Sequence, residues 1–130
     1  MIILQYILFT IMLFAFSNNI KAQNSNQNNT KMENINQLDA LHDISKSLSV
    51  KVLFEGKEGV TRSLQINKDG ILAEHITKTE AILICVSGAV IYEDEKSNNR
   101  TLNSGDFYRI EPNVKHWVKG VENSQLLLIK

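Results

Sequence analysis

The chain has 130 residues, of which 43% are hydrophobic and 22% are charged, and this is the balance of one ordinary globular domain. Its 14 basic and 14 acidic residues cancel, and neither sign gathers into a long run, so the composition excludes the charged surface of a nucleic-acid-binding protein. The single cysteine, Cys85, cannot form an internal disulfide and lies in an apolar run, where a small buried side chain is expected.

The first 22 residues are predicted to be a signal peptide. Residues 2–16 are apolar apart from Gln5 and Thr10, a run shorter than the ~20 residues of a membrane-spanning helix but suited to a signal-peptide core. Cleavage after Ala22 predicts a periplasmic or secreted product that is not attached to the membrane. The stretch before the apolar core lacks the usual Lys or Arg, which favours the alternative of a cytoplasmic product that starts at Met32.

Two further segments precede the strands. Residues 23–34 are rich in Asn and Gln, and they are predicted to form a disordered linker because they cannot bury enough apolar surface to order themselves. From Ile35 to Leu48 apolar residues recur at spacings of three and four, which predicts an amphipathic helix over 35–48. His42 lies beside this stripe and is expected to be a packed or exposed histidine, not a ligand.

From residue 50 onward the sequence has the pattern of short strands. Apolar and polar residues alternate with a period of two, for example between Val60 and Ile66, and turns with Gly, Asn or Ser separate nearly all of the runs. The nine predicted strands cover 50–54, 60–66, 71–75, 81–86, 90–94, 100–102, 106–110, 116–118 and 125–129. Such regular spacing without helical intervals predicts an all-β antiparallel sandwich or barrel.

Two segments in this region resemble the two sequence motifs of the cupin superfamily. The first runs from Gly70 to Gly88, and the second runs from Gly105 to His116. The resemblance implies an all-β fold, the double-stranded β-helix or cupin-type jelly-roll barrel, over 35–130 and preceded by the short N-terminal helix. It also implies a homodimer, because small cupins commonly pair.

The resemblance also implies where a metal site would lie. The family uses two histidines and a glutamate from the first motif and one histidine from the second. His75 takes the first of these positions and His116 takes the last, whereas Thr77 replaces the second histidine and Ala81 replaces the glutamate. Glu80 is one residue away, and strand alternation turns it to the opposite face. Two of the four ligands therefore remain.

This reduced ligand set favours binding over catalysis. A catalytic zinc or iron site normally needs three protein side chains, so no catalytic residue is assigned. Two imidazoles suit one weakly held divalent transition metal, Zn, Ni, Cu or Fe, with water completing its coordination.

The favoured hypothesis is a non-catalytic domain that binds a small molecule or such a metal in a barrel pocket. The predicted pocket residues are His75, Thr77, Ala81, Leu83 and His116, with His75 and His116 as the metal ligands. Two alternatives stay open at this point. One is a metal-dependent oxygenase or isomerase, and the other is a homodimeric assembly module with a vestigial pocket.

Overall fold

The computed structural model describes residues 36–130. The signal peptide predicted over 1–22 and the linker predicted over 23–34 lie outside these residues. Within the described part, no helix is long and apolar enough to span a membrane.

The amphipathic helix predicted over 35–48 is wrong for the described part of that stretch. It contains one short 3-10 helix, η1 (Asp39–Leu41), followed by bends. The apolar stripe does not become buried, since Ile44 remains 74% exposed. The Oδ1 atom of Asp43 accepts hydrogen bonds from the backbone N–H and the hydroxyl of Ser45, and this local turn competes with helical hydrogen bonding.

Polar contacts hold the segment after η1 against the neighbouring strands. The two ring nitrogens of His42 lie 2.9 Å from the hydroxyl of Ser49 and 2.8 Å from the hydroxyl of Ser63. The amide of Asn67 donates to the backbone carbonyl groups of Ile44 and Lys46. These side-chain contacts, and not the burial of an apolar helix face, therefore secure this part of the chain.

All nine predicted strands are present in the described residues. Their bounds are β1 (Leu48–Glu55), β2 (Val60–Ile66), β3 (Ile71–His75), β4 (Ala81–Ser87), β5 (Ala89–Asp94), β6 (Asn99–Asn103), β7 (Phe107–Ile110), β8 (His116–Gly120) and β9 (Ser124–Ile129).

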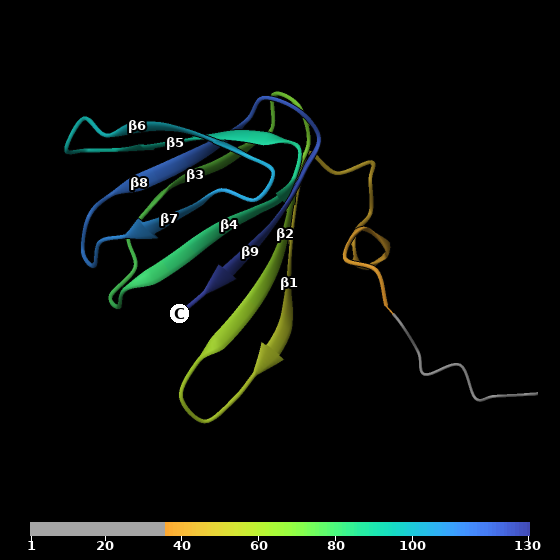
Figure 1. The fold of residues 1–130 in the computed structure, drawn as a ribbon, viewed down its shortest axis with the longest axis horizontal. Coiled ribbons are helices and arrows are strands. Elements are labelled where there is room, and N and C mark those ends of the chain that lie inside the picture. The colour runs from red at the N-terminus through yellow and green to blue at the C-terminus, as the bar shows by residue number, and fades with distance from the viewer. Residues whose placement is uncertain (1–35) are drawn as a thin grey trace, which may run out of the picture. The chain divides into compact units, whose positions relative to one another are not determined.

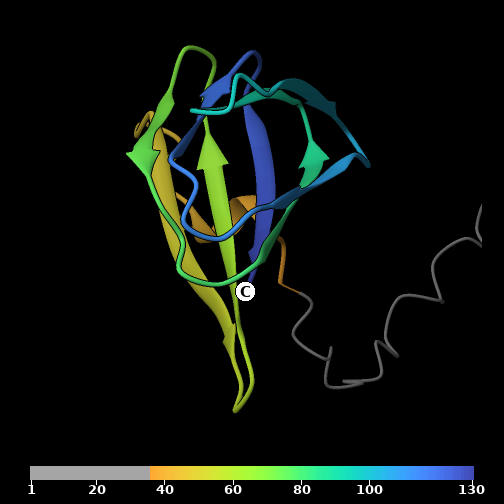
Figure 2. The same ribbon diagram turned by 90° about the vertical axis from the view of Figure 1, so that its left-hand side faces the viewer.

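The strands form two antiparallel sheets, with the orders β1-β2-β9-β4-β7 and β3-β8-β5-β6 (Figure 1). Strands far apart in the chain lie side by side, because β2 pairs with β9 and β3 pairs with β8. Figure 2 shows the β1–β2 hairpin extending beyond the rest of the two sheets. The architecture is an all-β jelly-roll barrel, as the sequence predicted.

The core lies between the two sheets and is built from alternate strand residues. In β4, Ala81, Leu83 and Cys85 are 3%, 1% and 0% exposed, whereas Glu80 just before the strand is exposed. The inward face that the alternation predicted is therefore correct. Burial raises the pKa of the Cys85 thiol, with Asp106 adding to the effect, so this side chain stays protonated and acts as a small apolar residue.

The turn between β4 and β5 requires a glycine. Gly88 has a φ of +83°, and a Cβ atom there would collide with the carbonyl of Asn123 and the hydroxyl of Ser124. Gly105 has a similar φ of +91°, but no atom lies within 4 Å of the position of its Cβ. The two glycines thus share a backbone conformation and differ in their surroundings.

We expect Gly88→Ala to lower the free energy of unfolding more than Gly105→Ala. The left-handed conformation costs both variants about 1–2 kcal/mol, and the collision adds to this cost at Gly88 alone. Urea denaturation of the two variants and the wild type measures the difference. Equal losses would show that the contacts around Gly88 yield to a methyl group.

Candidate functional site

The structure brings His75 and His116 together. His75 is the last residue of β3 and His116 is the first residue of β8, and the two stand directly opposite each other in the antiparallel pair. Their ring centroids are 4.3 Å apart, with an angle of 57° between the ring planes. At this separation the two rings contact each other directly.

The backbone sets the protonated nitrogen of each ring. The Nδ1 atom of His75 lies 2.9 Å from the carbonyl oxygen of Ala73, and that of His116 lies 2.9 Å from the carbonyl oxygen of Val114. A carbonyl oxygen can only accept, so each neutral ring carries its hydrogen on Nδ1 and has a lone pair on Nε2. Within residues 36–130 neither Nε2 atom has a hydrogen-bond partner. This is the form in which imidazole accepts a hydrogen bond or binds a metal.

His116 is the more deeply buried of the pair. It is 1% exposed, and the loss of solvation lowers its pKa; the carbonyl of Val114 opposes this effect and the nearby His75 adds to it. Its ring also stacks on Tyr92 at 5.6 Å, and Tyr92 contacts Tyr108 at 4.5 Å. His116 is therefore held in an apolar, aromatic setting that favours the neutral ring.

The other predicted pocket residues lie in the core but do not all share one cavity. Thr77 is 3% exposed, and its hydroxyl donates to the carbonyl of Thr79 over 2.6 Å. Ala81 lines a cavity of about 420 Å³, whereas Thr77, Leu83 and the two histidines are not part of its lining. The structure thus joins the histidines but separates them from the cavity beside Ala81.

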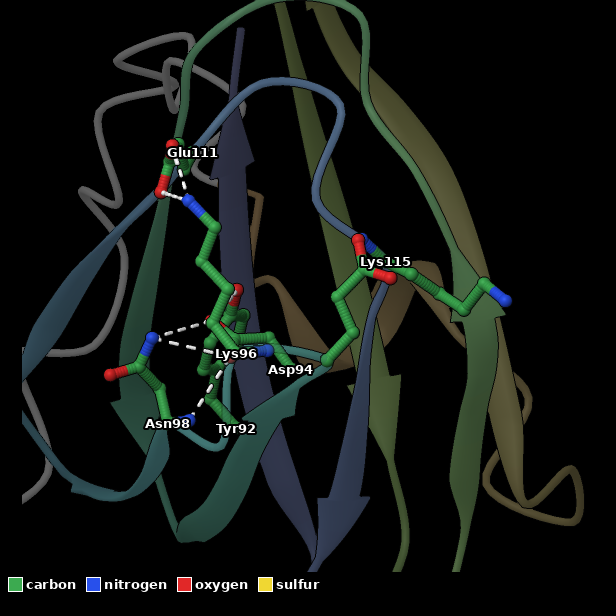
Figure 3. A network of polar contacts seen from close by, with 7 residues as sticks. Tyr92, Asp94, Lys96, Asn98, Glu111 and Lys115 are labelled. Atoms are coloured by element: carbon green, nitrogen blue, oxygen red, sulfur yellow. Dashed lines mark hydrogen bonds and ion pairs between the residues drawn. The ribbon is translucent and has the colours of Figure 1, made fainter.

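Tyr92 and Asp94 are neighbours of His116 that were not singled out in the sequence. Asp94 stands opposite His116 in the β5–β8 pair, and the hydroxyl of Tyr92 donates to its Oδ2 atom over 3.4 Å (Figure 3). Burial, followed by the charge of Asp94, raises the pKa of Tyr92, so the hydroxyl remains a donor. The signal was available, because positions 92 and 94 share one face of the predicted strand 90–94.

Asp94 is already occupied by the turn that follows β5. Its Oδ1 atom accepts from the backbone N–H groups of Lys96 and Asn98, and its Oδ2 atom accepts from the Asn98 amide over 2.9 Å (Figure 3). In the same view Lys96 forms an ion pair with Glu111, with 2.7 Å between Nζ and Oε1. The carboxylate nearest to the histidines is therefore engaged in holding the turn.

The residues present do not fit a metal centre with three protein ligands. Nowhere in residues 36–130 do three or more His, Cys, Asp or Glu side chains gather so that they could hold one ion. Ala81 has no ligand atom at the glutamate position, and the hydroxyl hydrogen of Thr77 is engaged by a carbonyl. Of the four positions named by the motif resemblance, only His75 and His116 offer a lone pair, on Nε2, that the described residues leave free.

Comparisons with known proteins agree with this architecture. No protein-family model matches the chain, and no curated protein matches it. Among solved structures, a conserved protein of unknown function from Streptococcus pyogenes is 16% identical, with a TM-score of 0.65 over 78% of this chain and 90% of its own. An RmlC-like cupin from Desulfovibrio desulfuricans is 15% identical, with a TM-score of 0.65 over 75% of this chain and 94% of its own.

A cupin-2 domain protein from Shewanella frigidimarina is 20% identical, with a TM-score of 0.60 over 70% of this chain and 85% of its own. The two sheets and their strand order define a small jelly-roll barrel, and these likenesses show that it is the cupin fold. The resemblance seen in the motifs from Gly70 to Gly88 and from Gly105 to His116 is thereby confirmed at the level of the fold.

The lowered pKa of His116 predicts that the metal-free protein loses stability as the pH falls. Below about 6.5 the unfolded chain gains a proton that folded His116 does not, so the free energy of unfolding decreases until the pH reaches the lowered pKa. The decrease should be smaller in His116→Gln than in the wild type. It should not be absent, because burial and Lys51 also lower the pKa of His42, so His42 causes a loss of the same kind. Urea denaturation between pH 8 and pH 5 with a chelator measures the free energy of unfolding. If this free energy falls equally steeply with pH in the wild type and in His116→Gln, the effect does not come from His116.

Proposed function

We propose that this protein is a non-catalytic binding module that holds a small ligand or a weakly bound divalent transition metal between His75 and His116. The observation that carries the proposal is the pairing of two rings, 4.3 Å apart, that both have Nδ1 committed to a backbone carbonyl. Each ring therefore has a free Nε2 lone pair, and a hydrogen-bond donor or cation within reach of both would be bound by the pair.

The side chains packed on His116 are aromatic and would suit a ligand with a mainly apolar body. Tyr92 stacks on His116, and Tyr108 contacts Tyr92 and packs against the core. Small-molecule sites are typically apolar with a few polar groups that fix orientation, and the two imidazoles supply such groups here. A metal-dependent oxygenase or isomerase is less well supported, because Thr77 and Ala81 do not complete a set of three ligands.

The metal form of the proposal predicts that Ni²⁺ or Zn²⁺ raises the melting temperature of the full chain. An ion at 100 times its Kd adds about 2.7 kcal/mol, which corresponds to a shift on the order of 10 °C for a domain of this size. The shift should disappear in His75→Ala and in His116→Gln, and it should persist in the matched control His42→Gln. Thermal denaturation with and without a chelator measures it, and a shift that survives both site variants would place the ion elsewhere.

A second candidate function, assembly as a homodimer, is favoured by the exposed edge strand β1. This strand lies at one edge of its sheet, and Val50, Val52, Leu53 and Phe54 are 43%, 57%, 43% and 66% exposed. Adjacent apolar side chains on an unpaired strand edge are typical of a surface that joins another chain. We propose that a second copy of this chain covers them.

If β1 forms the dimer contact, Phe54→Ser should convert the protein from dimer to monomer at micromolar concentration. The control Ile71→Ser removes a side chain of similar exposure, 53%, from β3 in the other sheet, and it should leave the dimer intact. Light scattering coupled to size-exclusion chromatography gives the mass of each protein. A monomeric wild type would refute assembly through this edge.

A further inference from the structure

Arg62 lies on the core-facing side of β2. It stands opposite Leu128 of β9, and Leu128 stands opposite Leu83 of β4. Both leucines belong to the core, with exposures of 8% and 1%. Residues directly opposite in antiparallel strands share a face. Every second residue of a strand also shares a face, so Arg62 lies on the same side of β2 as the core residues Leu64 and Ile66. An arginine thus occupies a row that is otherwise apolar.

This arginine carries a buried hydrogen-bond donor without an acceptor. Its Nη1 atom is buried and has no hydrogen-bond partner. Within residues 36–130 none of the ion pairs involves Arg62. A guanidinium group stays charged at all ordinary pH values, so it cannot relieve its burial by losing a proton. The arrangement costs stability unless an anion reaches the guanidinium group.

A continuous line of contacts joins the row of Arg62 to the histidine pair. The row runs through Leu83 to Tyr108, which stands opposite it in β7. The ring of Tyr108 contacts Tyr92, and Tyr92 stacks on His116. This line of contacts crosses from the sheet that holds Arg62 to the sheet that holds the histidines.

Charged side chains line the cavity beside the start of β2, although Arg62 is not part of its lining. Val52 stands opposite Arg62 in β1 and is 57% exposed. Lys130 forms backbone hydrogen bonds with Val60, two residues before Arg62, and it lines the cavity of about 420 Å³. Arg109, Glu80 and Glu111 also line this cavity, and the charge of Glu111 is balanced by Lys96.

We propose that the ligand of the barrel carries a carboxylate or phosphate group and that Arg62 receives this group. The proposal rests on the function proposed above and names the chemistry of its ligand. The planar guanidinium group pairs with an oxyanion through two parallel hydrogen bonds, which would supply an acceptor for the unpartnered donor. The Nε2 atoms of the histidines accept from the polar end of the ligand.

Benzoate and phenyl phosphate are suitable probes, with benzyl alcohol as the neutral control and sodium chloride to equalise ionic strength. At 10 mM we expect at least one of the two anions to raise the melting temperature of the full chain by several degrees, and benzyl alcohol to leave it unchanged. A shift with one anion alone identifies carboxylate or phosphate as the preferred group, and a shift with both identifies the oxyanion in general. No shift with either anion would overturn the proposal.

The variant Arg62→Met tests whether Arg62 receives the anion. Methionine keeps an apolar side chain of similar length, so the anion shift should be lost while the melting temperature without ligand stays equal or rises. Arg100→Met is the matched control, because Arg100 is exposed on β6, does not line the cavity and should leave the anion shift intact. A shift that persists in Arg62→Met, or a marked loss of stability in that variant without ligand, would contradict the proposal.

A metal titration of Arg62→Met separates this inference from the proposed function. The rise in melting temperature that Ni²⁺ causes depends on the histidines, so it should persist in Arg62→Met. An intact Ni²⁺ shift without any anion shift in the wild type rejects the role of Arg62 alone. If His116→Gln changes neither the Ni²⁺ shift nor the anion shift of the wild type, the histidine pocket itself is rejected.

Discussion

The pairing of β3 with β8 is the constraint on which the candidate site depends. It places His75 directly opposite His116, and the same register places His116 opposite Asp94 in the next pair. A slip by one residue would turn every side chain of one strand to the other face, which would separate the two rings. The pairing also leaves each Nδ1 atom beside a carbonyl two residues earlier, so the backbone that positions the rings also selects their tautomer.

The inner surface of the barrel combines an apolar wall with a small number of polar groups of distinct roles. Asp94 and Thr77 are satisfied within the protein, by the turn after β5 and by the carbonyl of Thr79. Arg62 and the Nε2 atoms of the two histidines have hydrogen-bonding capacity that residues 36–130 do not use. Donors and acceptors that remain unpaired at buried or partly buried positions favour a bound partner, because leaving them unpaired costs stability.

The cupin fold by itself does not supply a reaction, since one fold can support many unrelated functions. In this chain the glutamate position of the family motif holds Ala81, which joins the apolar wall, and a position expected to hold histidine holds Thr77. These substitutions remove negative charge and ligand atoms from the place where a catalytic ion would bind. The proposed binding function rests on the remaining arrangement of two imidazoles, an apolar wall and an inward arginine.

The sequence alone determined the nine strands and the inward face of β4, because a period of two is a local property of the chain and becomes burial once any sheet forms. It also singled out His75 and His116 through their motif positions. The spacing of apolar residues by three and four over 35–48 wrongly predicted an amphipathic helix. Such a helix needs an apolar surface to pack on, and Ile44 remains exposed. Only the tertiary structure decided that the two rings meet, that Asp94 is occupied and that Arg62 points inward without a partner. The meeting of the rings depends on register between strands distant in sequence, which no local pattern encodes. The occupied carboxylate of Asp94 and the unpaired donor of Arg62 depend on which side-chain atoms lie within hydrogen-bond distance in the folded chain.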